Sequence, residues 1–157
     1  MANRLVKVRQ VSNATNTSEC GTAFAQISVL PINGLTDGVG VCIDRSENIY
    51  VSDVARHVIF KYRRGSTASQ VFAGTIDVAG YADGVGTAAK FNQPKSMCVD
   101  RRGTLWVIDS GNNLVRRVDE NGNVTTVASI PAEVAGDVPG HIAVGASEEI
   151  FLTDNTP

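Results

Sequence analysis

VCIDRSENIYVSDVARHVIFKY (41–62) and MCVDRRGTLWVIDSGNNLVRRV (97–118) align along their whole length, and this pair of stretches decides the fold. A third and shorter copy, IAVGASEEIFLTDNTP, follows them. Asp44, Asp100 and Gly145 are equivalent in the three copies, at spacings of 56 and then 45 residues. An internal period of this kind indicates a protein built from repeated structural units.

Each copy has the pattern of a β-hairpin, in which a polar turn separates two short apolar runs. The first two copies continue with a third strand, HVIFKY or NLVRRV, and a fourth, QVFAG or VTTVAS. Four antiparallel strands in roughly 45 residues are typical of a β-propeller blade. We therefore predict an all-β fold in which 1–157 forms one propeller-type domain of about three blades: 38–75, 94–129, and a composite blade made from 139–157 and 3–30.

Pro94–Val118 resembles the unit of the NHL repeat family, P-x-G-hydrophobic-x-hydrophobic-D-x-x-G-x-hydrophobic-hydrophobic-V-x-D-x-x-N-x-R-hydrophobic-x-x-hydrophobic. AGYADGVGTAAKFNQP (79–94) resembles the connector between blades in bacterial members, and TDGVG at Thr36 is a shortened echo of it. The first copy departs from the family with VARH in place of a Gly-Asn turn, and the third has Gly145 in place of the Asp. The resemblance implies a β-propeller but no particular function, because propellers host binding, scaffolding and catalysis alike.

The repeats raise the question of how such a ring closes. A closed propeller has about four to eight blades, so about three blades do not close alone. The third copy has only two strands, whereas RLVKVRQV (4–11) and AFAQISVL (23–30) resemble a third and a fourth strand. We predict a head-to-tail homodimer, since joined termini would cover exposed strand edges. The residues expected to pair between chains are Leu5, Val6, Val8 and Val11 at one end and Ile150, Phe151 and Leu152 at the other.

Two alternatives to this dimer remain open. In the first, the sequence is a fragment of a longer propeller that was cut at Pro157. In the second, an open arc of three blades is covered by another protein, as in a larger assembly. The start of the sequence, MANR, resembles a natural N-terminus and favours the dimer over the fragment.

Composition limits the expected partners. The sequence has 14 Lys and Arg against 16 Asp and Glu, with a pI of about 5.6, so no overall field attracts nucleic acid or an anionic membrane. Arg4, Lys7 and Arg9 interrupt the apolar residues of the N-terminal segment, which is not the pattern of an export signal. No stretch approaches about 18 apolar residues. We expect a protein of the cytoplasm or of an assembled particle, with no membrane partner.

Few residues have the spacing that metal or covalent chemistry needs. Cys20, Cys42 and Cys98 are in no metal-ligand spacing, and two histidines, His57 and His141, are too few for a zinc-dependent lyase. The sequence therefore predicts no cofactor, no metal and no catalytic residue.

Asp53, Asp109 and Asp154 recur directly after the second strand of each copy. They would either converge on a cation near the propeller axis or accept backbone N–H groups in a turn. Because a structural turn is needed in every blade, the recurrence favours the turn.

A basic cluster recurs in and after the third strand of the first two copies. Its members are Lys61, Arg63, Arg64, Arg116 and Arg117. They would form either a positive surface that binds RNA, as in some NHL propellers, or a protection of outer strands against pairing with other sheets. The net charge of −2 favours protection, so nucleic acid is not the expected partner.

Tyr50, Trp106 and Phe151 share one position within the second strand of each copy, which is typical of packing between blades. As a whole, the sequence favours a non-enzymatic structural or protein-interaction module: a half propeller that self-assembles or docks into a larger assembly, such as a phage virion. Two alternatives are a metal-dependent lyase or hydrolase on an NHL-like propeller and an RNA-binding NHL propeller.

Overall fold

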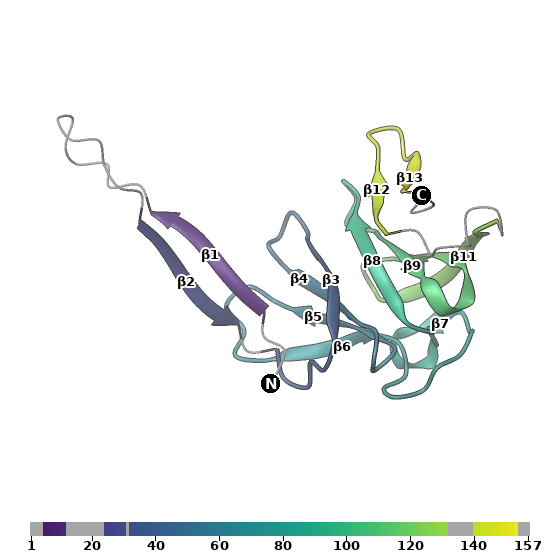
Figure 1. The fold of residues 1–157 in the computed structure, drawn as a ribbon, viewed down its shortest axis with the longest axis horizontal. Helices are drawn as coiled ribbons and strands as arrows, with labels where there is room; N and C mark the ends of the chain where they lie inside the picture. Colours follow the sequence, from purple (N-terminus) through teal and green to yellow (C-terminus); the bar gives the residue numbers. More distant parts are fainter. Residues whose placement is uncertain (1–4, 12–23, 31, 132–139, 154–157) are drawn as a thin grey trace.

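The computed structural model describes residues 5–11, 24–30, 32–131 and 140–153, and most of its regular structure is β-strand (Figure 1). The elements, in chain order, are β1 (Leu5–Val11), β2 (Phe24–Leu30), β3 (Gly38–Ile43), β4 (Ile49–Asp53), β5 (Val58–Tyr62), β6 (Ser69–Ala73), β7 (Gly84–Val85), the 3-10 helix η1 (Gly86–Ala88), β8 (Pro94–Val99), β9 (Leu105–Asp109), the 3-10 helix η2 (Ser110–Asn112), β10 (Leu114–Val118), β11 (Asn123–Ser129), β12 (Ile142–Val144) and β13 (Ile150–Leu152).

Three antiparallel sheets follow one another along the chain and fan out side by side (Figure 1). Blade one has the strand order β3-β4-β5-β6, and blade two has the order β8-β9-β10-β11. The third sheet, β12 and β13, packs against blade two and is called the half-blade below. The fold is a partial β-propeller, and the prediction of an all-β fold with four-stranded blades is confirmed.

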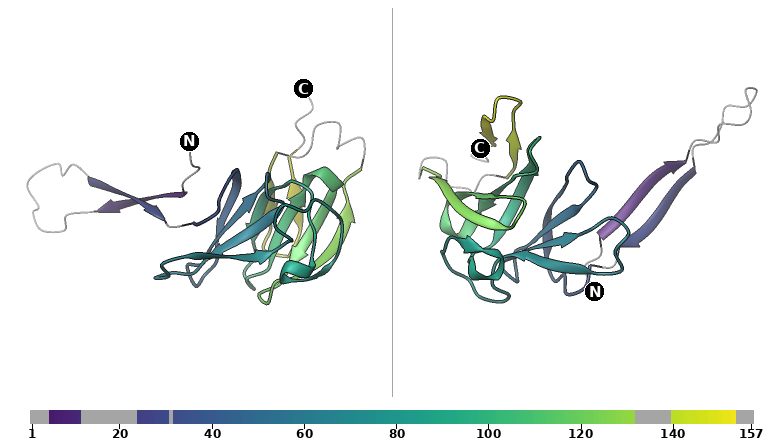
Figure 2. Two further views of the ribbon diagram at one scale, coloured as in Figure 1. Left: turned by 90° about the horizontal axis from the view of Figure 1, so that it is seen from below. Right: turned by 180° about the vertical axis from the view of Figure 1, so that it is seen from behind.

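Two features extend this description. The connector between the blades contributes β7, which pairs with β11 and adds a fifth strand to the outer edge of blade two. β1 and β2 pair with each other, from Leu5–Leu30 to Val11–Phe24, and form a separate hairpin that points away from the blades (Figure 2). The composite blade needs this hairpin to meet the half-blade of another copy, so that blade stays a prediction.

An aspartate fixes the turn between the first two strands of each full blade. The Asp44 carboxylate accepts the backbone N–H of Asn48 at 2.9 Å, and the Asp100 carboxylate accepts that of Thr104 at 2.9 Å. Side chains that accept hydrogen bonds from their own turn in this way define Asx turns. The polar residues of the repeat therefore hold each hairpin closed.

The same two carboxylates also hold the aromatic residue of the second strand. Tyr50 Oη donates to Asp44 at 3.1 Å, and Trp106 Nε1 donates to Asp100 at 3.2 Å. The half-blade lacks both members of this pair, because Gly145 and Phe151 occupy the equivalent positions. The half-blade thus has neither the carboxylate that accepts this hydrogen bond nor an aromatic side chain that donates it.

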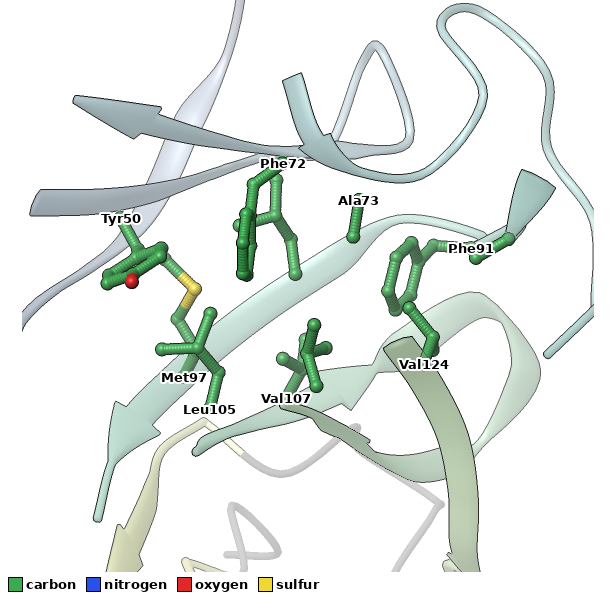
Figure 3. Packing of buried hydrophobic residues seen from close by; sticks show 11 residues of the cluster. Tyr50, Phe72, Ala73, Phe91, Met97, Leu105, Val107 and Val124 are labelled. Carbon is green, nitrogen blue, oxygen red and sulfur yellow. The ribbon is translucent and has the colours of Figure 1, made fainter. Parts of the chain in front are cut away.

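The main core lies between blade one and blade two (Figure 3). The rings of Tyr50 and Phe72 on blade one meet edge to face, with 5.2 Å between their centroids. Met97 and Leu105 of blade two and Phe91 of the connector belong to the same buried cluster. Burial of an apolar side chain of this size stabilises a fold by about 1.5–3 kcal/mol, so contact between blades is a main source of stability.

The innermost strands of the two blades, β3 and β8, approach each other closely. The Gly40 N–H donates to Ser52 Oγ at 2.8 Å, and the Ser52 hydroxyl donates to the Lys95 carbonyl of blade two at 2.6 Å. A Cβ at position 40 would collide with that carbonyl oxygen and would lie 2.8 Å from Ser52 Oγ. The approach of the next blade therefore requires a glycine here.

A buried arginine ties the connector to blade two. The side chains of Arg116 and Asp109 are both completely buried, and Arg116 Nη1 lies 2.7 Å from Asp109 Oδ2. Arg116 also donates to the Asp83 carboxylate at 2.8 Å and to the Ala82 and Lys90 carbonyls at 2.9 and 3.2 Å. The Arg116 guanidinium on β10 thus binds the connector at Ala82 and Asp83 and again at Lys90.

Replacement of Arg116 by methionine should lower the free energy of unfolding by about 3–5 kcal/mol, because Asp109 would be left as an unpaired charge in the interior. Denaturant unfolding followed by Trp106 fluorescence measures the loss. Arg117→Met, on the exposed neighbour, is the matched control and should change stability by less than about 0.5 kcal/mol. Equal effects of the two substitutions would contradict the role given to the ion pair.

Asp44 and Asp100 should make the fold sensitive to acid. Partial burial opposes ionisation of both carboxylates, but the hydrogen bonds from their turns outweigh it and hold each pKa below the ordinary value of 3.8. Their contribution to stability is therefore complete above the unfolded-state pKa of about 4 and is lost as the pH falls through the lowered native values.

The measurement is the free energy of unfolding between about pH 7 and about pH 2 for the wild type and for Asp100→Asn. The variant should be less stable at neutral pH and should lose less stability below about pH 4. Parallel pH profiles for the two proteins would rule out this contribution of Asp100.

Candidate interaction surface

The exposed fraction of the aromatic residue in the second strand shows whether the following blade covers that strand. Tyr50 of blade one and Trp106 of blade two are 1% and 9% exposed, because blade two and the half-blade cover them. Phe151 of the half-blade is 60% exposed. The half-blade thus presents an aromatic face that no described residue covers.

The first strand of each blade carries the residues that cover this aromatic position. In blade two, Met97 is buried in one cluster with Tyr50, and Val99 packs against that cluster. In the half-blade, Ile142 is buried in one cluster with Trp106. Each contact between blades therefore joins an aromatic side chain to aliphatic side chains of the following blade.

The equivalent aliphatic residues of blade one are uncovered. Val41 and Ile43 stand at the positions of Met97 and Val99, and they are 53% and 56% exposed. Val39, earlier on β3, is 54% exposed. Apolar side chains gathered in this way often mark an interaction site. One end of the chain thus exposes the aromatic part of the contact between blades, and the other end exposes the aliphatic part. The same contact forms between blades one and two and between blade two and the half-blade.

The outer edge of the half-blade is also open. β13 pairs with β12 from Ile142–Leu152 to Val144–Ile150, and its other edge pairs with no strand in the described ranges. Ile150 and Leu152 pack inward against the cluster that contains Trp106.

The predicted inter-chain residues lie in two different sheets of one chain. Ile150, Phe151 and Leu152 are on β13, whereas Leu5, Val6, Val8 and Val11 are on β1 and pair with β2. Pairing between these two groups across copies stays a prediction.

The five predicted basic residues do not share one surface. Arg116 is completely buried and pairs with Asp83 and Asp109, so the prediction that it belongs to a surface patch is wrong. Lys61 is 9% exposed, and Arg63, Arg64 and Arg117 are exposed. Arg116 and Arg117 are neighbours on a strand and therefore point to opposite faces. A comparison of the repeats contained a signal for this, because Arg116 is equivalent to the buried Phe60.

The recurring aspartates serve the backbone. The Asp53 carboxylate accepts the N–H of Arg56 at 3.1 Å, and the Asp109 carboxylate accepts that of Asn92 at 2.7 Å. The turn interpretation agrees with the structure at Asp53, whereas Asp109 accepts from the connector residue Asn92 and pairs with Arg116. Asp154 lies outside the described residues. Within the described ranges, three or more His, Cys, Asp or Glu side chains are nowhere gathered as metal ligands. The same part of the chain contains no helix long and apolar enough to span a membrane.

Together, these blades and their uncovered end faces define a class of protein, the partial β-propeller. Residues 91–124 match the family model described as the NHL repeat, so the chain carries an NHL repeat and the resemblance seen in the sequence is confirmed.

The chain is also similar to individual known proteins. It is 31% identical over 83 residues to the protein SUPPRESSOR OF QUENCHING 1, chloroplastic, of Arabidopsis thaliana, a match that covers 53% of this chain and 8% of that protein. An auxiliary nutrient binding protein from Bacteroides thetaiotaomicron has a similar structure, with a TM-score of 0.65 and 17% identity. So does a streptogramin B lyase, with a TM-score of 0.62 and 15% identity.

These likenesses differ in extent. Each of the two structural matches covers 82% of this chain and 38% of the other chain. The chain therefore spans less than half the length of all three proteins. At 15–17% identity, the structural likeness is one of fold.

Cys42 and Cys98 should react slowly with iodoacetamide at about pH 8. Burial raises the pKa of the Cys42 thiol to about 12 and that of Cys98 to about 11, so little of either is present as the reactive thiolate. Peptide mass spectrometry measures the labelling rates, which should rise at least about tenfold in denaturant. Fast labelling of the native protein would contradict the burial of these thiols.

Proposed function

We propose that this chain is a non-enzymatic assembly module, a half β-propeller that joins a second copy head to tail and presents the loops of the completed ring to protein partners. The observation that carries the proposal is the match between the two exposed end faces. Phe151 lacks the aliphatic cover that Tyr50 has, and the exposed Val41 and Ile43 are the residues that supply such cover elsewhere in the repeat.

A second copy is the occupant that fits both ends. The packing between blades one and two and between blade two and the half-blade already gives the geometry of the contact. Repeating it once more places Phe151 of one copy against Val41 and Ile43 of the other. The contact joins two different faces, so it is heterologous. In a pair of copies related by a two-fold rotation, it forms once at each junction and closes the ring.

The strand edges support the same arrangement. The half-blade has two strands and an open β13 edge, and β1 and β2 form a hairpin of two strands. Pairing β13 with β1 of the second copy would complete a four-stranded blade on each side. It would also remove edges that otherwise favour uncontrolled association.

The alternative functions receive less support. An RNA-binding surface would lose two of its five predicted cations, because Lys61 and Arg116 are both buried. The likeness to a lyase rests on fold, at 15% identity. A place for the assembled ring within a larger particle such as a virion stays a prediction.

The mass of the purified chain in solution, measured by light scattering, tests the proposal. We expect a dimer that Val41→Glu and Phe151→Lys each weaken by at least about tenfold in Kd, since each places a charge at the centre of an apolar contact. Val85→Glu is the matched control, because Val85 is 61% exposed on β7 and lies on neither end face.

Mixing the two variants makes the test specific for a head-to-tail ring. A mixed pair has one native contact and one that joins a lysine to a glutamate, so dimers should return on mixing. A wild-type chain that is a folded monomer at about 100 μM would overturn the proposal, and would indicate cover by a different protein or by further blades. A wild-type dimer that is unaffected by both variants would also overturn it.

A further inference from the structure

A cleft of about 370 Å³ opens between blade one and blade two, away from the end faces. Three turns form its rim: the turn between β3 and β4, the turn between β8 and β9, and the turn between β10 and β11. Tyr50 and Lys61, on the central strands of blade one, form part of its wall. Polar and charged side chains therefore line a recess between two sheets.

Lys61 is the unusual member of this lining. It is only 9% exposed, and its ammonium group stacks over the rings of Tyr50 and Phe72, 5.0 and 4.9 Å from their centroids. Among the described residues, no carboxylate lies within 4.0 Å of Nζ, and no side-chain hydrogen bond of Lys61 is formed. The aliphatic stem is thus buried along apolar surface, while Nζ, which is not among the buried polar atoms that lack a partner, faces the cleft.

The acidic residues of the cleft do not supply that partner. Asp44 already accepts hydrogen bonds from the backbone and side chain of Asn48 and from the Tyr50 hydroxyl. Glu120 stands on the exposed turn between β10 and β11 and forms no ion pair with Lys61. Burial is the main cause that lowers the pKa of Lys61, and the more distant charges of Asp44 and Glu120 only partly oppose it. The ammonium group is thus partly desolvated, and no described carboxylate forms an ion pair with it.

Further cations face the same cleft. Arg45 stands on the turn of blade one, and Arg101 and Arg102 stand on the equivalent turn of blade two. Arg102 pairs with Glu148 of the half-blade at 2.8 Å. Setting that pair aside, three cations oppose two carboxylates, which leaves the cleft with a charge of about +1.

The repeat alone does not produce this arrangement. The residue equivalent to Lys61 in blade two is Arg117, which is exposed. The equivalent recess between blade two and the half-blade has about 130 Å³, and Arg102 and Glu148 both line it. Of these two recesses, only the first is lined by a lysine that lies over aromatic rings.

We propose that the cleft between blades one and two binds a small anion through a single carboxylate group, which meets the Lys61 ammonium and the Arg101 guanidinium. A carboxylate supplies the charged acceptor that no described side chain places against the Lys61 ammonium, and guanidinium binds carboxylates in a planar fork. The single excess positive charge matches a monoanion, while Asp44 and Glu120 at the rim disfavour a dianion such as phosphate. The open volume admits a small molecule.

The test is an NMR titration of the full chain with sodium acetate, against sodium chloride at equal ionic strength. The side-chain signals of Lys61 should shift saturably with a Kd of about 1–10 mM, and the pKa of Lys61 should rise as the carboxylate binds. Amide signals at 44–46 and 101–103 should shift together with them. A second probe, a blocked tripeptide with one central glutamate, distinguishes the source of the carboxylate, because tighter binding of the tripeptide than of acetate would assign the site to a peptide side chain.

Lys61→Met keeps the apolar stem over Tyr50 and Phe72 and removes only the charge. It should abolish saturable binding without loss of stability, since the lysine has no ionic partner to lose. Arg117→Met, at the equivalent position of blade two, should bind acetate as the wild type does.

Three results would overturn the proposal: non-saturable shifts, undiminished binding by Lys61→Met, or equal weakening by Lys61→Met and Arg117→Met. The last would indicate only general attraction to surface charge. Inorganic phosphate bound more than about tenfold tighter than acetate would overturn the assignment to a monocarboxylate.

Discussion

The structure depends on one constraint: a propeller blade is apolar on both faces and must be covered on both. All five residues of β5 and all five of β9 are buried, which a strand achieves only when each face of its sheet is covered. Blade two meets this condition with a sheet on either side. On blade one, Gly34 lies near Phe60, but Val39, Val41 and Ile43 of β3 are exposed. The sheet faces that carry the exposed Val41 and Ile43 at one end and Phe151 at the other are not covered by a described residue.

The two faces of a blade are chemically different, and this gives the arc a direction. One face carries an aromatic residue held by an aspartate, as in the pairs Asp44–Tyr50 and Asp100–Trp106. The other face carries aliphatic residues of the first strand that cover the aromatic residue of the preceding blade. Like faces therefore do not match, and a blade accepts its neighbours in one order only.

The sequence predicts the repeat well, because hairpins are written in local patterns of apolar runs and turn residues. It predicts side-chain environments less well. Arg116 reads as a surface cation beside Arg117, yet its burial depends on Asp109 and on a connector whose path has no local signal. The tetrapeptide DGVG shows the same limit. At 37–40 it leads into the innermost strand of a blade, and at 83–86 it forms an outermost strand and the start of a 3-10 helix, because the surrounding sheets differ. The cleft at Lys61 was equally beyond local pattern, since two blades and three turns build it.

Gly40 has a consequence for the curvature of the whole arc. Where its backbone approaches the Lys95 carbonyl, the inner strands of the two blades, β3 and β8, come into close contact. The gap at this inner edge sets the wedge angle between neighbouring sheets, and the wedge angle sets how many sheets complete a full circle. The absence of a Cβ at Gly40 thus helps to determine how many blades complete the ring.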